Sequence, residues 1–295
     1  MIIEFFNYAL NGALLGLLYA LVAMGFVVIY RASKVFNMAV GEMLVLGAFL
    51  VWWAIASRGL HPAAGIGVAL AIAVLVGLAI ERLLFRRLIG ESVFSMIMVT
   101  IGLLILMRGL VLVIWGPQER AFPALIPLQP VIVGEMIVPR PLVAAGLLAV
   151  VFALGLHWFF NRSRTGLAMS AVAEDHQIAL SMGISVRRSI AFAWALGGVM
   201  SVVASIVYLS GKSLTFLSSE VGFASLPVAL LAGLESVRGL LLAGLIVGVI
   251  QGLTAAYVDP LIGGNAASVV PYLFMLGVLI VRPTGMFGWR RIERV

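Results

Sequence analysis

The sequence contains no cysteine and few charged residues. Of its 295 residues, 11% are Asp, Glu, Lys or Arg, and three are histidine. The lack of cysteine excludes a disulfide framework and any thiolate metal site. About 25% of the residues of a soluble globular domain are charged, so the low charge content excludes a water-soluble enzyme and a disordered scaffold. It also argues against a nucleic-acid-binding domain, although the formal net charge is +7.

Hydrophobic residues make up 63% of the chain and form long runs between the charges. A membrane-spanning helix needs about 20 apolar residues. We extend the second run back to Val35, which encloses Glu42, and the fourth to Trp115, which encloses Arg108. The pattern predicts an all-α polytopic membrane protein with eight to nine transmembrane helices, the short seventh run being a crossing or a re-entrant segment. The charge-free runs cover residues 5–30, 43–57, 59–80, 92–107, 141–161, 189–211, 221–234, 239–258 and 260–281.

The basic residues are divided unequally between the two sides of the predicted membrane. If all nine runs cross and the N-terminus lies outside, fourteen of the 19 Lys and Arg residues fall on one side and four on the other. Cytoplasmic loops are rich in Lys and Arg, so we expect the richer side, with the C-terminus, to be cytoplasmic. No basic residue precedes the first run, and we therefore expect residues 5–30 to be a retained helix and not a signal peptide.

The polar stretch at residues 161–188 lies on the predicted cytoplasmic side and contains its own short amphipathic helix. We expect Ser170 to cap the start of this helix, with Glu174 and Asp175 early in it and Gly183 at its end. Such a helix offers a shaped surface to a cytoplasmic partner. An interfacial helix on the bilayer is the alternative, but the acidic pair and the lack of lysine argue against binding to an anionic membrane.

Glycines at intervals of four occur in two of the predicted spans. Small residues at this spacing let helix backbones approach closely in a membrane, which predicts helix contacts along both stripes. Glycine is also common in membrane helices generally, and the 32 glycines make some such matches certain. The stripes consist of Gly12 and Gly16 in the first span and of Gly244, Gly248 and Gly252 in the eighth.

Two ionisable residues fall inside predicted spans. A charged side chain at the bilayer centre costs about 2.5–3.5 kcal/mol on insertion scales, so each needs a partner or a function. Glu42 can pair with a basic residue, break its helix beside Gly41 or line a pathway. Arg108 can pair with a carboxylate, but we favour an arginine that extends outward to the membrane surface. The histidines show no metal-ligand spacing, and we expect no metal and no cofactor.

Three stretches resemble one transporter family. GLAMSAVAEDHQIALSMGI (166–184), FNMAVGEMLVLGAF (36–49) and RPTGMFG (282–288) are similar to sequences of bacterial branched-chain amino acid ABC transporter permeases. The resemblance implies a single transmembrane permease domain over residues 1–295, in the inner membrane. It also implies that residues 161–188 form the loop that couples the permease to an ATPase, with Gly166, Ala173, Glu174, Asp175, Ala179 and Gly183 in it.

Further expectations follow from this resemblance. The partners would be a second homologous permease chain, two cytoplasmic ATPase subunits and a periplasmic substrate-binding protein. Branched-chain amino acids are the implied substrates, with urea, short amides or aromatic acids as alternatives. The translocation path or its gate would include Asn37, Gly41, Glu42 and Arg108.

The chain itself is not expected to be an enzyme. Gly211-Lys212-Ser213 is similar to the end of a phosphate-binding loop, but that loop needs a glycine where the chain has Ile206. A membrane-embedded enzyme would need clustered His and Asp or a nucleophile pair. The alternative function is a secondary transporter driven by an ion gradient, which favours inverted repeats and several carboxylates within the membrane.

Overall fold

The computed structural model describes residues 2–88 and 91–288. In these ranges seven helices are long and apolar enough to span a membrane. The chain is therefore a multi-pass membrane protein. The long helices are α1 (Ile2–Ser33), α2 (Val40–Trp52) with the π-helical turn η1 (Trp53–Ser57), α3 (Pro62–Leu83) followed by the 3-10 turn η2 (Phe85–Arg87), α4 (Val93–Trp115), α5 (Arg140–Arg162), α8 (Val186–Leu209) and α11 (Val237–Leu253) with the π-helical turn η4 (Thr254–Val258).

Two further apolar segments are helical but shorter, and they correspond to the seventh and ninth runs of the sequence. The seventh is broken into η3 (Phe216–Ser219), α9 (Glu220–Ala224) and α10 (Leu226–Ala232). The ninth differs from our expectation of one long helix over residues 260–281. It consists of α12 (Asp259–Ile262), η5 (Ala266–Ser268) and α13 (Val270–Val281), because the chain turns at Gly263, whose φ is +61°.

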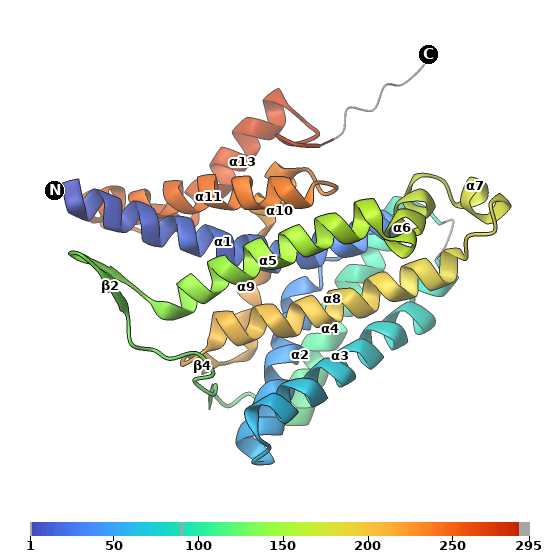
Figure 1. The fold of residues 1–295 in the computed structure, drawn as a ribbon, viewed down its shortest axis with the longest axis horizontal. Coiled ribbons are helices and arrows are strands. Elements are labelled where there is room, and N and C mark those ends of the chain that lie inside the picture. The colour runs from blue at the N-terminus through green and yellow to red at the C-terminus, as the bar shows by residue number, and fades with distance from the viewer. Residues whose placement is uncertain (1, 89–90, 289–295) are drawn as a thin grey trace.

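The connections gather at two opposite ends of the molecule (Figure 1). At one end, which we call the hairpin end, β1 (Arg120–Ala121) pairs with β4 (Ser213–Leu214), and β2 (Val131–Val133) forms a hairpin with β3 (Met136–Val138). At the other end, α6 (Arg164–Glu174) and α7 (His176–Ser181) connect α5 to α8. We call this second end the α6–α7 end.

Helix α1 forms the centre of the molecule and is buried on most sides from Gly16 onward. Its glycines lie against those of α11. A Cβ atom on Gly12 would lie 2.5 Å from the carbonyl oxygen of Gly248, and one on Gly244 would lie 2.5 Å from the carbonyl oxygen of Gly16. A Cβ atom on Gly252 would lie 2.8 Å from the Cα atom of Gly12. Only glycine fits at this approach, and the two helices pack backbone against backbone.

The basic residues are distributed unequally between the two ends of the molecule. Arg290, Arg291 and Arg294, which the sequence assigns to the cytoplasmic side, lie outside the described residues. Four basic residues lie beside or in η1, β1, the start of α5 and β4: Arg58, Arg120, Arg140 and Lys212. Eleven others lie in or beside the last turns of α1, α3 with η2, α5 and α13 or the first turns of α6, α8 and α11: Arg31, Lys34, Arg82, Arg86, Arg87, Arg162, Arg164, Arg187, Arg188, Arg238 and Arg282.

Candidate functional site

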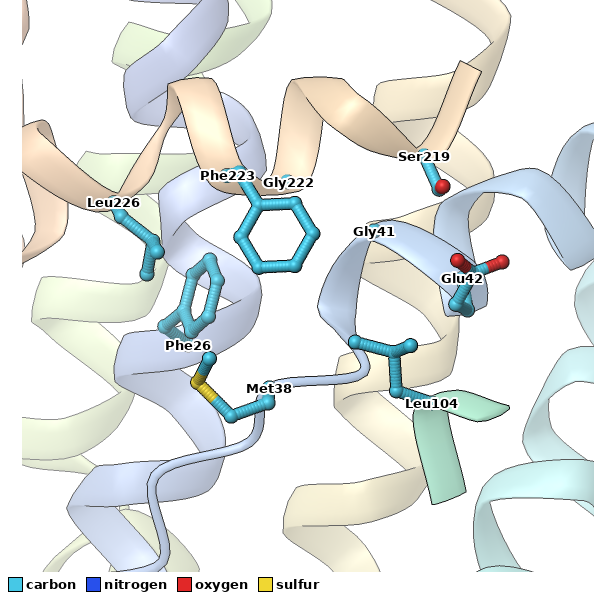
Figure 2. Close-up of a pocket in the computed structure, with 9 residues that line it drawn as sticks. All are labelled: Phe26, Met38, Gly41, Glu42, Leu104, Ser219, Gly222, Phe223 and Leu226. Carbon is cyan, nitrogen blue, oxygen red and sulfur yellow. The ribbon is translucent and has the colours of Figure 1, made fainter. Parts of the chain in front are cut away.

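The start of α2 crosses the broken seventh segment at two glycines. A Cβ atom on Gly41 would lie 3.3 Å from the Cα atom of Gly222, and one on Gly222 would lie 2.6 Å from the Cα atom of Gly41. Because neither residue has a side chain, the two backbones come close together. The crossing brings Glu42 of α2 beside Ser219 at the end of η3 (Figure 2).

Glu42 and Arg108 form an ion pair at this crossing. The Glu42 side chain is 1% exposed, and its Oε1 atom accepts hydrogen bonds from Arg108 Nε at 2.9 Å and lies 2.7 Å from Arg108 Nη2. Arg108 Nη2 also donates to the hydroxyl of Ser219 at 3.0 Å. Our expectation that Arg108 extends outward to the membrane surface is therefore wrong. The cost of leaving Glu42 unpaired in an apolar setting favours the internal pair.

A narrow cleft lies between the start of α2 and the seventh segment (Figure 2). The space between its walls is too narrow to admit a water molecule. Its wall is mostly apolar, with Glu42 and Ser219 as the polar members. The lining residues are Phe26, Met38, Gly41, Glu42, Leu104, Ser219, Gly222, Phe223 and Leu226. The cleft is thus closed in this conformation.

Asn37 is fully buried and bonds within its own segment. Its Oδ1 atom accepts a hydrogen bond from the backbone N–H of Ala39 at 3.0 Å, and its Nδ2 atom lies 3.3 Å from the sulfur of Met43. These contacts hold the turn that leads into α2. Asn37 therefore orients the segment that carries Glu42 and does not itself line the cleft.

The loop at residues 161–188 folds into two helices with different caps from those we expected. Ser163 caps α6 by accepting a hydrogen bond from the N–H of Gly166 at 2.9 Å. Ser170 lies inside α6, and its hydroxyl is buried without a hydrogen-bond partner among the described residues. Asp175 separates the two helices, since its Oδ1 atom accepts from the N–H groups of Gln177 at 2.7 Å and Ile178 at 2.9 Å and so caps α7. The prediction of a single helix that starts at Ser170 is therefore wrong.

Apolar side chains of α7 and the residue after it are exposed. Ile178 is 61% exposed, Leu180 59% and Met182 76%, whereas Ala173 and Ala179 are buried against the rest of the molecule. Gly166 lets α6 fold back on α5, because a Cβ atom there would lie 2.8 Å from the Cα atom of Phe160. Gly183 follows α7 with a φ of +75°. The loop therefore presents an apolar surface at the end of the molecule.

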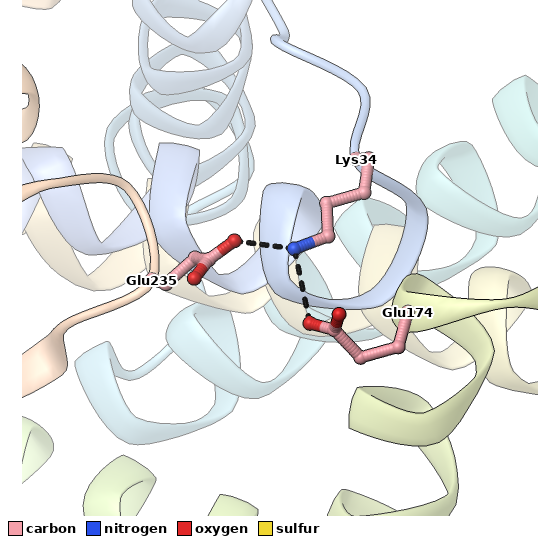
Figure 3. Close-up of polar contacts among 3 residues, drawn as sticks. All are labelled: Lys34, Glu174 and Glu235. Carbon is pink, nitrogen blue, oxygen red and sulfur yellow. Dashed lines mark hydrogen bonds and ion pairs between the residues drawn. The ribbon is translucent and has the colours of Figure 1, made fainter. Parts of the chain in front are cut away.

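Lys34 joins three segments at the α6–α7 end (Figure 3). Its Nζ atom forms ion pairs with Glu174 at 3.4 Å and with Glu235, which lies in the turn between α10 and α11. Lys34 has a φ of +54°, in the left-handed region, directly after α1. Sequence reasoning missed this junction. No local pattern in the sequence relates Glu235 to a lysine 201 residues earlier.

No three His, Asp or Glu side chains come together in residues 2–88 and 91–288 in a way that could hold a metal ion. The candidate site thus consists of the ion pair of Glu42 and Arg108 at the closed cleft. The segment that follows Lys34 connects it to the junction of Lys34, Glu174 and Glu235 at the α6–α7 end.

A family described as branched-chain amino acid transport system / permease component matches residues 8–280. The chain belongs to this family. It is therefore a permease subunit of an ABC transport system. Its sequence is 30% identical to the high-affinity branched-chain amino acid transport system permease protein LivH of Escherichia coli K12, over 99% of this chain and 98% of LivH.

Other relatives of the permease are similar over comparable lengths. BraD of Pseudomonas aeruginosa, also a high-affinity branched-chain amino acid transport system permease protein, is 27% identical over 100% of this chain and 99% of its own. A solved structure of PsaBC from Streptococcus pneumoniae in complex with Fab aligns with 96% of this chain and 97% of its own at 15% identity. Its TM-score of 0.48 is too low to define a shared fold.

Proposed function

We propose that this permease carries branched-chain amino acids, or related small amino acids and amides, across the bacterial inner membrane. The proposal rests on the match to the family over nearly the whole chain and on relatives of almost equal length that are named as branched-chain amino acid permeases. The partners proposed are a second homologous permease chain, two cytoplasmic ATPase subunits and a periplasmic substrate-binding protein.

The α6–α7 end is proposed to face the cytoplasm, with the N-terminus outside and eight to nine crossings in all. The uneven distribution of Lys and Arg supports this orientation, because positively charged loops are retained on the cytoplasmic side. The hairpin end, with its strands β1 to β4, then faces the binding protein.

Residues 161–188 are proposed to be the loop that docks on the ATPase. The support comes from Ile178, Leu180 and Met182, which are large and apolar yet more than half exposed. They lie at the end of the molecule and outside the predicted spans, so lipid chains do not cover them. A partner with an apolar groove is the chemistry that suits this surface.

The Lys34 junction is proposed to transmit movement of this loop to the cleft. Lys34 directly precedes residues 35–42, which lead to Met38, Gly41 and Glu42 in one wall of the cleft. Glu235 follows α10, whose first residue, Leu226, belongs to the other wall. A displacement of Glu174 in the loop can therefore pull on both walls at once. Opening of the cleft would then follow docking and closure of the ATPase subunits.

Substitution of one exposed residue tests the docking surface. Ile178→Glu should abolish co-purification of the ATPase subunits with the permease, because it places a charge in an apolar contact. Ile132→Glu is the matched control, since Ile132 is 68% exposed but lies at the hairpin end, and it should retain the ATPase. Retention by the first variant, or loss by the second, would contradict the assignment of the ends.

Transport itself is tested in proteoliposomes that contain the whole complex. Uptake of L-leucine should require ATP and the binding protein. Uptake driven by a proton or sodium gradient without ATP would instead support a secondary transporter.

A further inference from the structure

The ion pair of Glu42 and Arg108 leaves part of its hydrogen-bonding capacity unused. Both bonding nitrogens of Arg108 approach the same carboxylate oxygen, Oε1. The other oxygen, Oε2, is buried and has no hydrogen-bond partner among the described residues. Buried polar atoms in proteins are nearly always bonded, and a carboxylate oxygen left alone costs more than a neutral one. Oε2 is therefore the position at which a ligand can supply a missing donor.

Arg108 has donors to offer as well. An arginine carries five N–H donors, and the hydrogen bonds of Arg108 within the described residues are made by Nε and Nη2. The side chain remains 36% exposed, whereas that of Glu42 is 1% exposed. The pair thus runs from Glu42 in the wall of the cleft to Arg108, which is partly exposed on α4.

Most apolar side chains of the cleft lie on the other side of Gly41 from the carboxylate, and Leu104 lies nearer to it (Figure 2). Phe26, Phe223 and Leu226 line the same cleft as Glu42. A ligand that satisfies the whole arrangement has a cationic donor for Oε2, an anionic acceptor for the guanidinium and an aliphatic group for the apolar wall. A free aliphatic amino acid has these three features on adjacent atoms.

We propose that Glu42 and Arg108 form a binding site for the α-ammonium and α-carboxylate groups of an aliphatic amino acid within the permease. This inference rests on the proposed function, which supplies the substrate class but no site. The ion pair and the zwitterion each have zero net charge, so binding introduces no net charge among the apolar helices.

The site requires the cleft to open. The space between the present walls has no room for a water molecule and therefore does not hold an amino acid. Opening separates Phe223 on α9 from Phe26 on α1. The closed cleft with a paired Glu42 and Arg108 is then the resting state, in which each residue satisfies the other until the zwitterion replaces part of their contact.

Direct binding to the purified permease complex tests the site without the selectivity of the binding protein. L-Leucine is compared with 4-methylpentanoate, which lacks the ammonium group, and with 3-methylbutan-1-amine, which lacks the carboxylate. Each charged hydrogen bond contributes enough that both analogues should bind about tenfold more weakly than leucine, or worse. Equal binding of the three compounds to the wild-type complex would refute the site without any substitution.

Variants of the pair separate a ligand site from a structural ion pair. Glu42→Gln should weaken leucine binding about tenfold and remove the preference for leucine over 4-methylpentanoate. The control is Glu81→Gln, because Glu81 is also 1% exposed and pairs with an arginine, Arg86, but lies outside the cleft. The control should bind leucine as the wild type does.

The double exchange of Glu42→Arg with Arg108→Glu restores an ion pair but reverses its ends. It should fold and retain the ATPase subunits, yet fail to bind leucine. Normal leucine binding by the exchanged pair would overturn the proposal. These results are distinct from a failure of the proposed function. If that function were wrong, the wild-type complex would show no ATP-driven uptake of leucine at all.

Discussion

Asp175 holds the start of α7 through its side chain, and this determines how its charge should be tested. Asp175→Ala removes hydrogen bonds to two backbone N–H groups. The loss of such a cap costs about 1 kcal/mol. We expect faster amide hydrogen exchange in α7 and weaker association with the ATPase subunits, because α7 carries the exposed apolar surface.

Asp175→Asn is the matched control for this prediction. Asparagine caps helices as well as aspartate does, so exchange in α7 and ATPase association should remain close to wild type. A variant Asp175→Asn that lost ATPase association with α7 intact would show that the negative charge contacts the partner directly. Reversal of the charges at residues 174 and 175 together cannot make this distinction, since both carboxylates are engaged within the chain.

The ion pair of Glu42 and Arg108 shows which parts of the site can be predicted from the sequence. The sequence identifies Glu42 and Arg108 as charges inside apolar runs, and the cost of burial singles out both. It does not reveal that they meet, because 66 residues separate them and the contact depends on the arrangement of α2 and α4. Ser219 and Gly222 were not predicted, because serine and glycine occur throughout membrane helices.

At the scale of elements, the Lys34 junction can be tested by exchanging charges. Lys34→Glu breaks the ion pairs with Glu174 and Glu235 and places like charges together. These side chains are partly exposed, so the loss of stability should be small, about 1 kcal/mol or less. ATP hydrolysis by the reconstituted complex should continue, while leucine uptake per ATP falls. Adding Glu235→Lys should recover part of the uptake.

Glu91→Lys is the control for the charge exchange. Glu91 is exposed beside the start of α4 and lies outside the junction. Its reversal should leave the ratio of uptake to hydrolysis unchanged. If Lys34→Glu also left the ratio unchanged, the junction would not transmit movement to the cleft.

The number of helical segments was easier to predict than their interruptions. Within residues 2–88 and 91–288, gaps between charges located the seven long helices and the two shorter apolar segments, because the cost of burying charge restricts where charged residues occur. The gaps do not show where the backbone leaves the helix. The seventh segment is divided near Ser219 and Ser225, and the ninth is delayed to Val270 by the turn at Gly263. These breaks come from serine, glycine and proline, which are as uncharged as leucine.

At the scale of the whole molecule, the absence of cysteine makes its orientation directly measurable. A single introduced cysteine is the one thiol in the chain. Ser181 in α7 and Glu135 between β2 and β3 are both exposed and lie at opposite ends. In intact cells, a membrane-impermeant maleimide should label Glu135→Cys, whereas Ser181→Cys should react only after the membrane is permeabilised. The unequal distribution of basic residues is the physical reason.

Thr284→Cys extends this test to the broken segments. Thr284 is exposed, and its carbonyl oxygen lies beside Gly233, near the Glu235 turn of the α6–α7 end. Labelling of Thr284→Cys only after permeabilisation, as for Ser181→Cys, would mean that the seventh and ninth segments each carry the chain from one side to the other despite their short helices. Labelling in intact cells would contradict a cytoplasmic C-terminus. It would also place the turn at Glu235 on the opposite side of the membrane from residues 161–188, to which Lys34 joins it. The proposed route from the ATPase to the cleft would then be wrong.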